Sequence, residues 1–146
     1  MNEAEIVNVI NRPAGEVFAV LADLDRYPDW NSHLTQVRKT SDGPLGVGST
    51  IVFVGKMLGR NFESDSVCTE YVANETLATK TTAGPFYIEV GYTLEPIEGG
   101  TRFTTVLRGE SKGFFKVGEG VAIGVVKKQF KASTANLKAL LEADSR

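Results

Sequence analysis

Residues 13–34 read PAGEVFAVLADLDRYPDWNSHL, and this stretch decides the fold. Apolar residues recur in it at helical spacing, at Val17, Val20, Leu21 and Leu24. Pro13 suits the first turn of a helix, where its missing N–H group would have no partner. Pro28 disfavours helical geometry at the residue before it, so one helix ends or restarts there. The stretch therefore predicts two short helices, at roughly residues 13–22 and 27–31.

The chain on either side of this stretch reads as β-strands. A first strand covers Glu3–Asn11, with apolar residues on both faces. Six further segments of strand character follow residue 34: TQVRK, GSTIVFVGK, NFESDSVCTEYV, TLATKTT, FYIEVGYTLEPI and TRFTTVLRGE. Most of the turns between them are short, which favours antiparallel neighbours in a sheet.

The last segment, from about Phe114, returns to helical spacing. One stripe of this helix is mainly apolar and consists of Ala122, Val126, Phe130, Ser133, Leu137, Leu140 and Leu141. The opposite stripe consists of Lys127, Lys131, Thr134, Lys138 and Glu142. Such a helix lies with its apolar face on a sheet. The order of elements predicts an α+β fold in which residues 1–146 form a single domain.

The composition restricts the class of protein. The chain has 146 residues, a net charge of -2 and one cysteine, as expected for a globular domain without disulfides. This charge gives no support for nucleic-acid binding. No apolar run approaches the roughly 18 residues of a membrane span, and MNEAEIVNVI lacks the apolar core of a signal peptide. We therefore expect a cytoplasmic protein without stable membrane insertion.

Alternation along the strands predicts which side chains face the long helix, because charged positions mark the outer face. The inner set includes Ile51, Phe53, Leu77, Thr79, Thr81, Phe86, Ile88, Val90, Tyr92, Phe103 and Thr105. Its aromatic members form either a packed core or the wall of a ligand cavity.

The strand at residues 61–72 does not follow one alternation. Val67 and Tyr71 share a parity with Glu63 and Asp65. If that face points inward, two carboxylates enter a cavity, where burial would raise their pKa values and suit acid–base chemistry. A β-bulge, or a strand end that lies in water, would instead leave both carboxylates outside.

Four glycines, Gly113, Gly118, Gly120 and Gly124, lie around the start of the last helix. A glycine inside a helix costs about 0.5–1 kcal/mol relative to alanine. Two interpretations remain open. The glycines leave space between helix and sheet for a ligand, or some of them form a loop and the helix begins near Val121.

The opening stretch resembles the start of the SRPBCC superfamily, which includes START lipid-binding domains, birch-pollen-allergen-like proteins and polyketide cyclases/dehydratases. The residues that carry the resemblance are Ile10, Pro13, Val17, Leu21, Asp23, Tyr27, Pro28, Trp30 and Asn31. The segments LEP at 94–96, GGTRFT at 99–104 and NLKALLE at 136–142 extend it over nearly the whole chain. Many such sequences carry a proline before the last helix, where this chain has Gly118–Gly120 instead.

The resemblance implies a helix-grip fold. In that fold a curved antiparallel sheet, usually of seven strands, wraps around a long C-terminal helix, and two small helices close one edge. The family's cavity lies between sheet and helix, where the alternation places the inward aromatic residues. The resemblance is informative about the fold and says little about activity.

Little in the sequence indicates metal or cofactor chemistry. No His/Cys/Asp cluster has metal-ligand spacing, so we expect neither a metal nor a cofactor. His33 is the only histidine, and we interpret it as a surface or supporting residue. GPLGVG at 43–48 lacks the Lys-Ser/Thr of a phosphate-binding loop and reads as a hairpin turn.

The first hypothesis is that the protein binds or transports a small hydrophobic or amphipathic molecule, such as a lipid, an aromatic compound or a polyketide-like compound. The expected ligand-binding residues are Phe53, Glu63, Tyr71, Phe86, Tyr92, Phe103, Thr105, Phe115 and Val126. We expect a monomer or a homodimer.

Two alternatives stay open. A polyketide cyclase or dehydratase would need acid–base groups in the cavity, and Glu63 and Asp65 are the candidates, with Tyr71 or Tyr92 as donors. A protein-interaction module would use Phe114 and Phe115. The sequence assigns no catalytic residue, and binding is preferred to catalysis.

Overall fold

A computed structural model describes residues 2–57, 59–110 and 118–143, apart from the side chain of Glu119. Its elements, in chain order, are β1 (Asn2–Ile10), α1 (Ala14–Leu21), the 3-10 turn η1 (Leu24–Arg26), α2 (Tyr27–Trp30), β2 (Leu34–Lys39), β3 (Thr50–Met57), β4 (Arg60–Val72), β5 (Thr76–Ala83), β6 (Tyr87–Ile97), β7 (Gly100–Glu110) and α3 (Glu119–Ala143).

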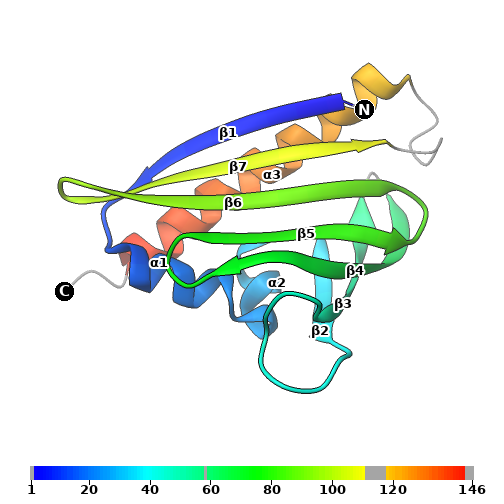
Figure 1. Ribbon diagram of the computed structural model, residues 1–146. Coiled ribbons are helices and arrows are strands. Elements are labelled where there is room, and N and C mark those ends of the chain that lie inside the picture. The colour runs from blue at the N-terminus through cyan, green and yellow to red at the C-terminus, as the bar shows by residue number, and fades with distance from the viewer. Residues whose placement is uncertain (1, 58, 111–117, 144–146) are drawn as a thin grey trace.

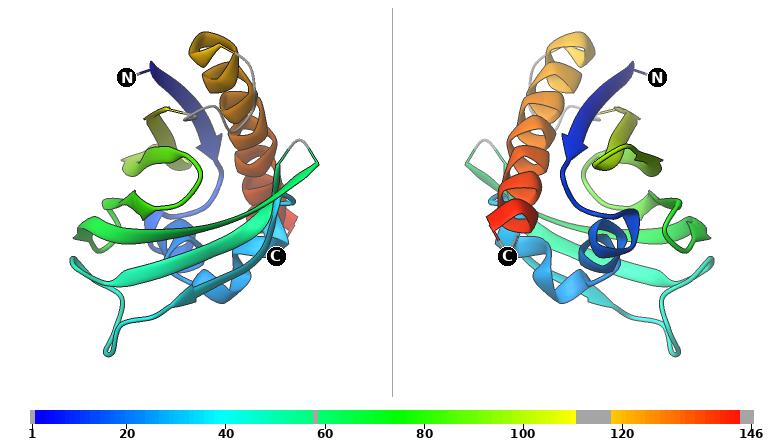
Figure 2. Two further views of the ribbon diagram at one scale, coloured as in Figure 1. Left: turned by 90° about the vertical axis from the view of Figure 1, so that its right-hand side faces the viewer. Right: turned by 90° about the vertical axis from the view of Figure 1, so that its left-hand side faces the viewer.

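The strands form one seven-stranded antiparallel sheet in the order β1-β7-β6-β5-β4-β3-β2. Strands β2 to β7 follow one another as neighbours, and β7 then pairs with β1. The sheet curves around α3, with α1 and α2 at one edge (Figures 1 and 2). This arrangement confirms the predicted α+β helix-grip fold.

The stretch after β1 forms the two predicted short helices, joined by η1. The Pro13 carbonyl accepts hydrogen bonds from the N–H groups of Glu16 and Val17, so Pro13 caps α1 and lies just before it. The second helix starts at Tyr27, as the prediction of a helix at roughly residues 27–31 expects, and the φ of -54° and ψ of -42° at Tyr27 are helical. The buried Tyr27 hydroxyl donates to the Leu21 carbonyl at 2.7 Å, and this tertiary contact outweighs the local preference before Pro28.

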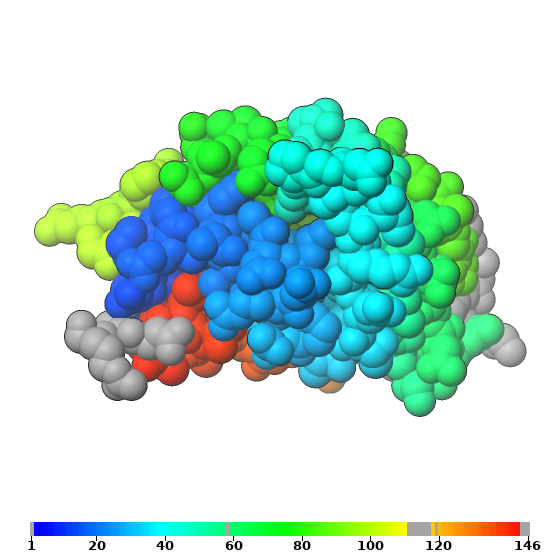
Figure 3. Space-filling model, turned by 90° about the horizontal axis from the view of Figure 1, so that it is seen from below, coloured from blue at the N-terminus to red at the C-terminus, as the bar shows by residue number. Residues whose placement is uncertain are grey.

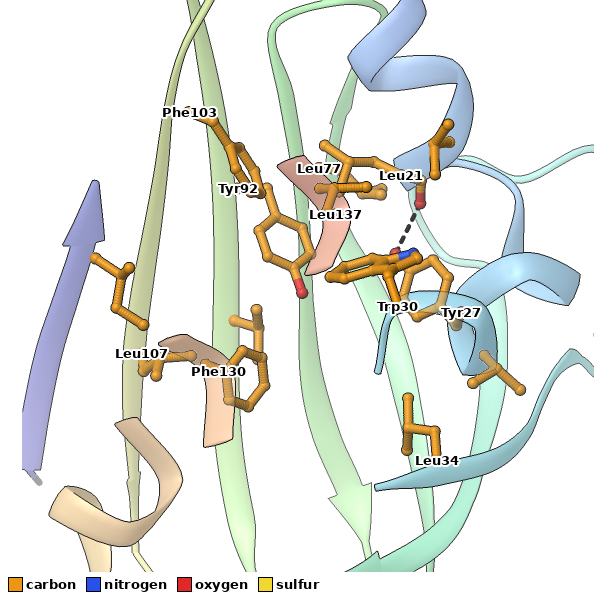
Figure 4. Close-up of a cluster of buried hydrophobic side chains, with 14 of the residues drawn as sticks. Leu21, Tyr27, Trp30, Leu34, Leu77, Tyr92, Phe103, Leu107, Phe130 and Leu137 are labelled. Atoms are coloured by element: carbon orange, nitrogen blue, oxygen red, sulfur yellow. Dashed lines mark hydrogen bonds between the residues drawn. The ribbon is translucent and has the colours of Figure 1, made fainter. Parts of the chain in front are cut away.

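Trp30 joins the short helices to the rest of the core. Its side chain is fully buried, with ring centroids 5.1 Å from Tyr27 and 6.3 Å from Tyr92 on β6 (Figure 4). The Asn136 side chain on α3 donates to the Trp30 carbonyl at 3.3 Å. The tryptophan therefore packs α2 against both the sheet and α3.

The predicted stripes of α3 are largely present, with one error. Thr134 was placed on the polar stripe but is fully buried. It lies one turn from both Phe130 and Leu137, which places it beside the apolar stripe. Its hydroxyl donates to the Lys131 carbonyl at 3.2 Å, so the helix itself satisfies the polar atom.

The glycines at the start of α3 do not make room for a ligand. The helix begins at Glu119, before the Val121 start that one interpretation expected. Gly118, Gly120 and Gly124 are exposed, and a Cβ atom added at any of them would meet no neighbour within 4 Å. Gly113 lies outside the described residues. The described glycines therefore face away from the sheet.

A β-bulge resolves the ambiguous strand. Cys68 pairs with Thr79 and Glu70 pairs with Ala78, so Thr69 is an extra residue opposite β5. Before the bulge the inward residues are Phe62, Ser64, Ser66 and Cys68, all of them buried. After the bulge the parity changes, and Tyr71 points inward.

Candidate functional site

A cavity of about 80 Å³ lies between the sheet and α3. The sheet contributes most of its wall, from strands β3 to β6, and α3 contributes Val126 and Phe130. Leu24 on η1 and Leu45 on the β2–β3 loop lie at its other side. Figure 3 shows the face of the molecule on which α1, η1 and α2 lie between that loop and the C-terminal part of α3.

Four of the expected ligand-binding residues line this cavity: Phe53, Phe86, Tyr92 and Val126. The other inward residues that alternation predicted on the same strands, Ile51, Leu77, Thr79, Thr81, Ile88 and Val90, line it as well. The period-2 pattern was sufficient for most of these residues because the pairing of β5 with β6 is regular from Thr76 to Lys80.

Three expected residues lie in the core away from the cavity. Phe103 and Thr105 are fully buried on β7, where α3 packs on β7 and β1, and neither residue lines the cavity. Phe103 supports the cavity wall indirectly, because its ring lies 5.4 Å from that of Tyr92, which lines the cavity. Tyr71 packs edge to face on Phe18 of α1, at 5.4 Å.

The two carboxylates do not enter the cavity. Glu63 and Asp65 are exposed, on the opposite face of β4 from Phe62 and Ser64. The prediction that Glu63 faces a ligand is therefore wrong, because the bulge changes the parity of the strand only beyond Cys68. Phe115 lies outside the described residues.

His33 lines the cavity, which the sequence did not predict. It sits between α2 and β2, and its ring stacks on Phe62 at 6.4 Å and lies 6.0 Å from Phe130. Burial lowers the pKa of His33 to about 4, so the ring is neutral at pH 7. A single histidine between a short helix and a strand belongs to neither the helical nor the strand pattern, so the sequence could not predict which way its side chain points.

Small polar groups interrupt the apolar wall. Ser64 and Ser66 are buried, and the Ser64 hydroxyl has no hydrogen-bond partner among the described residues. The Nδ1 atom of His33 is likewise buried and without a described partner. Thr81, in contrast, is satisfied, because its hydroxyl donates to the Ile88 carbonyl at 3.2 Å.

Two tyrosines, Tyr27 and Tyr92, also border the cavity. Burial raises the pKa of both hydroxyls above the ordinary value, so both stay protonated. The Tyr27 hydroxyl is occupied by its bond to Leu21. The Tyr92 hydroxyl points away from Phe103, toward the region of Trp30 and Phe130 (Figure 4).

No Asp, Glu, Lys or Arg occurs among the described residues that line the cavity. The part of the chain that the structure describes also contains no group of three or more His, Cys, Asp or Glu residues placed to hold a metal ion. None of its helices is long and apolar enough to cross a membrane. The site is thus an apolar cavity with a few neutral polar groups, a composition typical of small-molecule sites.

Residues 1–142 match the family described as polyketide cyclase / dehydrase and lipid transport, and the chain belongs to this family. The match covers the α1–α2 stretch, the sheet and nearly all of α3. The chain is thus a member of the SRPBCC group, as its sequence suggested. No curated protein matches it in sequence.

Solved structures share the fold over nearly the whole chain. A START superfamily protein from Mycobacterium smegmatis has a TM-score of 0.84 and 15% identity, with 97% of each chain covered. A protein from Thermus thermophilus has a TM-score of 0.83 and 15% identity, covering 99% of this chain and 100% of that one. The Zhui aromatase/cyclase from Streptomyces sp. R1128 has a TM-score of 0.83 and 15% identity, covering 99% and 96%. At this identity the likeness establishes the fold alone.

Proposed function

We propose that the protein binds a small, largely apolar molecule in the cavity between the sheet and α3. The observation that carries this proposal is the cavity itself, which is lined by aromatic and aliphatic side chains such as Phe53, Phe86 and Phe130. Empty space in a core costs free energy, because the surrounding atoms lose their contacts. A ligand that fills the space would recover those contacts. The family description, which includes lipid transport, supports the same conclusion.

The size of the cavity limits the ligand. Drug-sized molecules occupy pockets of about 300–1,000 Å³, and this cavity measures about 80 Å³. A drug-sized molecule therefore requires the wall to open. Leu24 and Leu45 lie on short, irregular segments at one side of the cavity, and we propose that these segments move apart on binding.

The proposed contacts differ from the set expected from the sequence. Phe53, Phe86, Tyr92 and Val126 would contact the ligand directly. Phe103 would act indirectly, by holding the Tyr92 ring in place.

A cyclase-type enzyme is the second candidate, suggested by the aromatase/cyclase among the structural neighbours. The exposure of Glu63 and Asp65 removes its best acid–base groups from the cavity. The titratable groups that remain at the cavity are His33 and the hydroxyls of Tyr27 and Tyr92, and burial keeps both hydroxyls protonated. Binding without chemistry is therefore the better supported function.

Native mass spectrometry of the purified protein tests for a bound molecule. Titration with N-phenyl-1-naphthylamine, an uncharged fluorescent probe, tests whether the cavity accepts an apolar guest. We expect saturable fluorescence enhancement with one probe per chain. A protein that retains no molecule and enhances no fluorescence would contradict the proposal.

A further inference from the structure

The strongest unexplained feature of the cavity is a pair of polar atoms without partners. The Ser64 hydroxyl and the Nδ1 atom of His33 are both buried and have no hydrogen-bond partner among the described residues. A buried polar group without a hydrogen-bond partner destabilises the fold. Both residues line the cavity, so a molecule inside it could satisfy them.

The two residues flank the same aromatic ring. His33 stacks on Phe62, and Ser64 is the next inward residue on β4, about 7 Å farther along the strand. In the sheet register Gly55 lies opposite Phe62, and Phe53 lies opposite Ser64. The His33 carbonyl accepts a hydrogen bond from the N–H group of Lys56, the residue after Gly55. His33 and Ser64 therefore lie on adjoining parts of one wall, with Phe62 between them.

The chemistry of these two groups favours a hydroxyl on the ligand. The serine hydroxyl can donate or accept, and a neutral imidazole Nδ1 does one or the other according to its tautomer. A ligand hydroxyl can also donate or accept, so it pairs with either form. Because the pKa of His33 is lowered, its ring is uncharged at neutral pH. The cavity therefore has no imidazolium cation that could attract an anionic ligand.

The rest of the described wall offers nothing to a charged ligand. It carries no Lys or Arg to pair with a carboxylate and no Asp or Glu to pair with an amine. Moving an unpaired charge from water into this apolar cavity is strongly unfavourable.

We propose, on the basis of the binding function above, that the cavity selects an uncharged aromatic ligand with one hydroxyl group, which pairs with His33 or with Ser64, and rejects ligands ionised at neutral pH. The ring lies among Phe62, Phe86 and Phe130, and the hydroxyl points either to His33 or to Ser64 on β4. The selection is measured as the difference in affinity between a phenol and a carboxylate that share the same kind of ring.

Three probes of nearly equal size test this selection at pH 7.5: ethylbenzene, 4-methylphenol and benzoate. Each competes with N-phenyl-1-naphthylamine for the wild-type protein and for a His33→Phe/Ser64→Ala variant. We expect 4-methylphenol and ethylbenzene to displace the reporter and benzoate to fail. In the double variant the affinity of 4-methylphenol relative to ethylbenzene should fall about tenfold, as a neutral hydrogen bond to the phenol hydroxyl is lost.

The controls separate this proposal from the binding function. Ethylbenzene binding to the double variant shows that its cavity is intact, and each single variant repeats the measurement if the double variant does not fold. Glu63→Gln, on the outer face of the same strand, should leave all three affinities unchanged. Equal displacement by benzoate and ethylbenzene, or an unchanged phenol preference in the variants, overturns the selection while binding stands. Failure of the reporter and of all three probes overturns binding itself.

Discussion

The ring of His33 lies against that of Phe62, with centroids 6.4 Å apart and planes inclined by 27°. Phe130 approaches the same imidazole from α3, at 6.0 Å. The only histidine of the chain thus sits between apolar rings from the sheet and the long helix. Burial lowers its pKa to about 4, against an ordinary 6.5.

This placement predicts a loss of stability in mild acid. The unfolded chain protonates His33 below about pH 6.5, while the folded chain resists protonation until about pH 4. The stabilisation is complete above pH 6.5 and is lost as the pH falls toward 4. The free energy of unfolding should drop by up to about 3 kcal/mol from this group.

Urea denaturation at several pH values measures the effect. Carboxylates titrate in the same range, so the comparison is with His33→Phe, which keeps a ring in place. The variant should lose most of the slope between pH 6.5 and 4. Parallel curves for the two proteins would show that His33 does not resist protonation.

Gly55 allows β3 to approach the turn that carries His33. A Cβ atom at Gly55 would stand 2.1 Å from the His33 carbonyl oxygen, which the Lys56 N–H group also contacts at 2.8 Å. Gly55→Ala should therefore destabilise the protein by more than about 2 kcal/mol and displace His33. Gly91→Ala is the matched control, because a Cβ there meets nothing within 4 Å. Similar melting temperatures for the two variants would contradict this account.

Trp30 supplies the central packing between α2, the sheet and α3. Because the side chain is fully buried, Trp30→Ala should lower the free energy of unfolding by about 3–5 kcal/mol. Trp30→Phe retains part of the contact with Tyr27 and should cost less. Urea denaturation followed by circular dichroism avoids the loss of tryptophan fluorescence. A cost below about 1 kcal/mol for the alanine variant would rule out this structural role.

The exposed glycines of α3 should be replaceable. Gly120→Ala and Gly124→Ala add a methyl group that meets no neighbour, and alanine favours the helix by about 0.5–1 kcal/mol. Each variant should melt at a higher temperature and bind N-phenyl-1-naphthylamine as the wild type does. Loss of probe binding would mean that these glycines shape the cavity after all.

The fold could be predicted because two periods are clear in the sequence. Alternation in β5, β6 and β7 separates charged outer residues such as Lys80 and Arg102 from inner ones such as Leu77 and Phe103. The stretch at residues 13–34 then places two short helices before the sheet. These local patterns persist in the structure because packing supports them.

The site was harder to predict because it depends on where α3 lies across the sheet. Alternation assigns Phe103 and Tyr92 to the same inner face, but only Tyr92 borders the cavity, since α3 covers β7. The bulge at Thr69 interrupts the parity of β4, so Ser64 could not be assigned to the wall. His33 follows a short helix, where neither period applies.

The most direct test of binding in the cavity compares two adjacent residues of β5. Thr79 lines the cavity, and Lys80 is exposed on the outer face. The measurement is the dissociation constant of N-phenyl-1-naphthylamine for the wild type, Thr79→Phe and Lys80→Phe. We expect Thr79→Phe to fill the cavity and weaken binding at least about tenfold, and Lys80→Phe to leave it unchanged. Equal affinities in all three folded proteins would contradict binding between the sheet and α3.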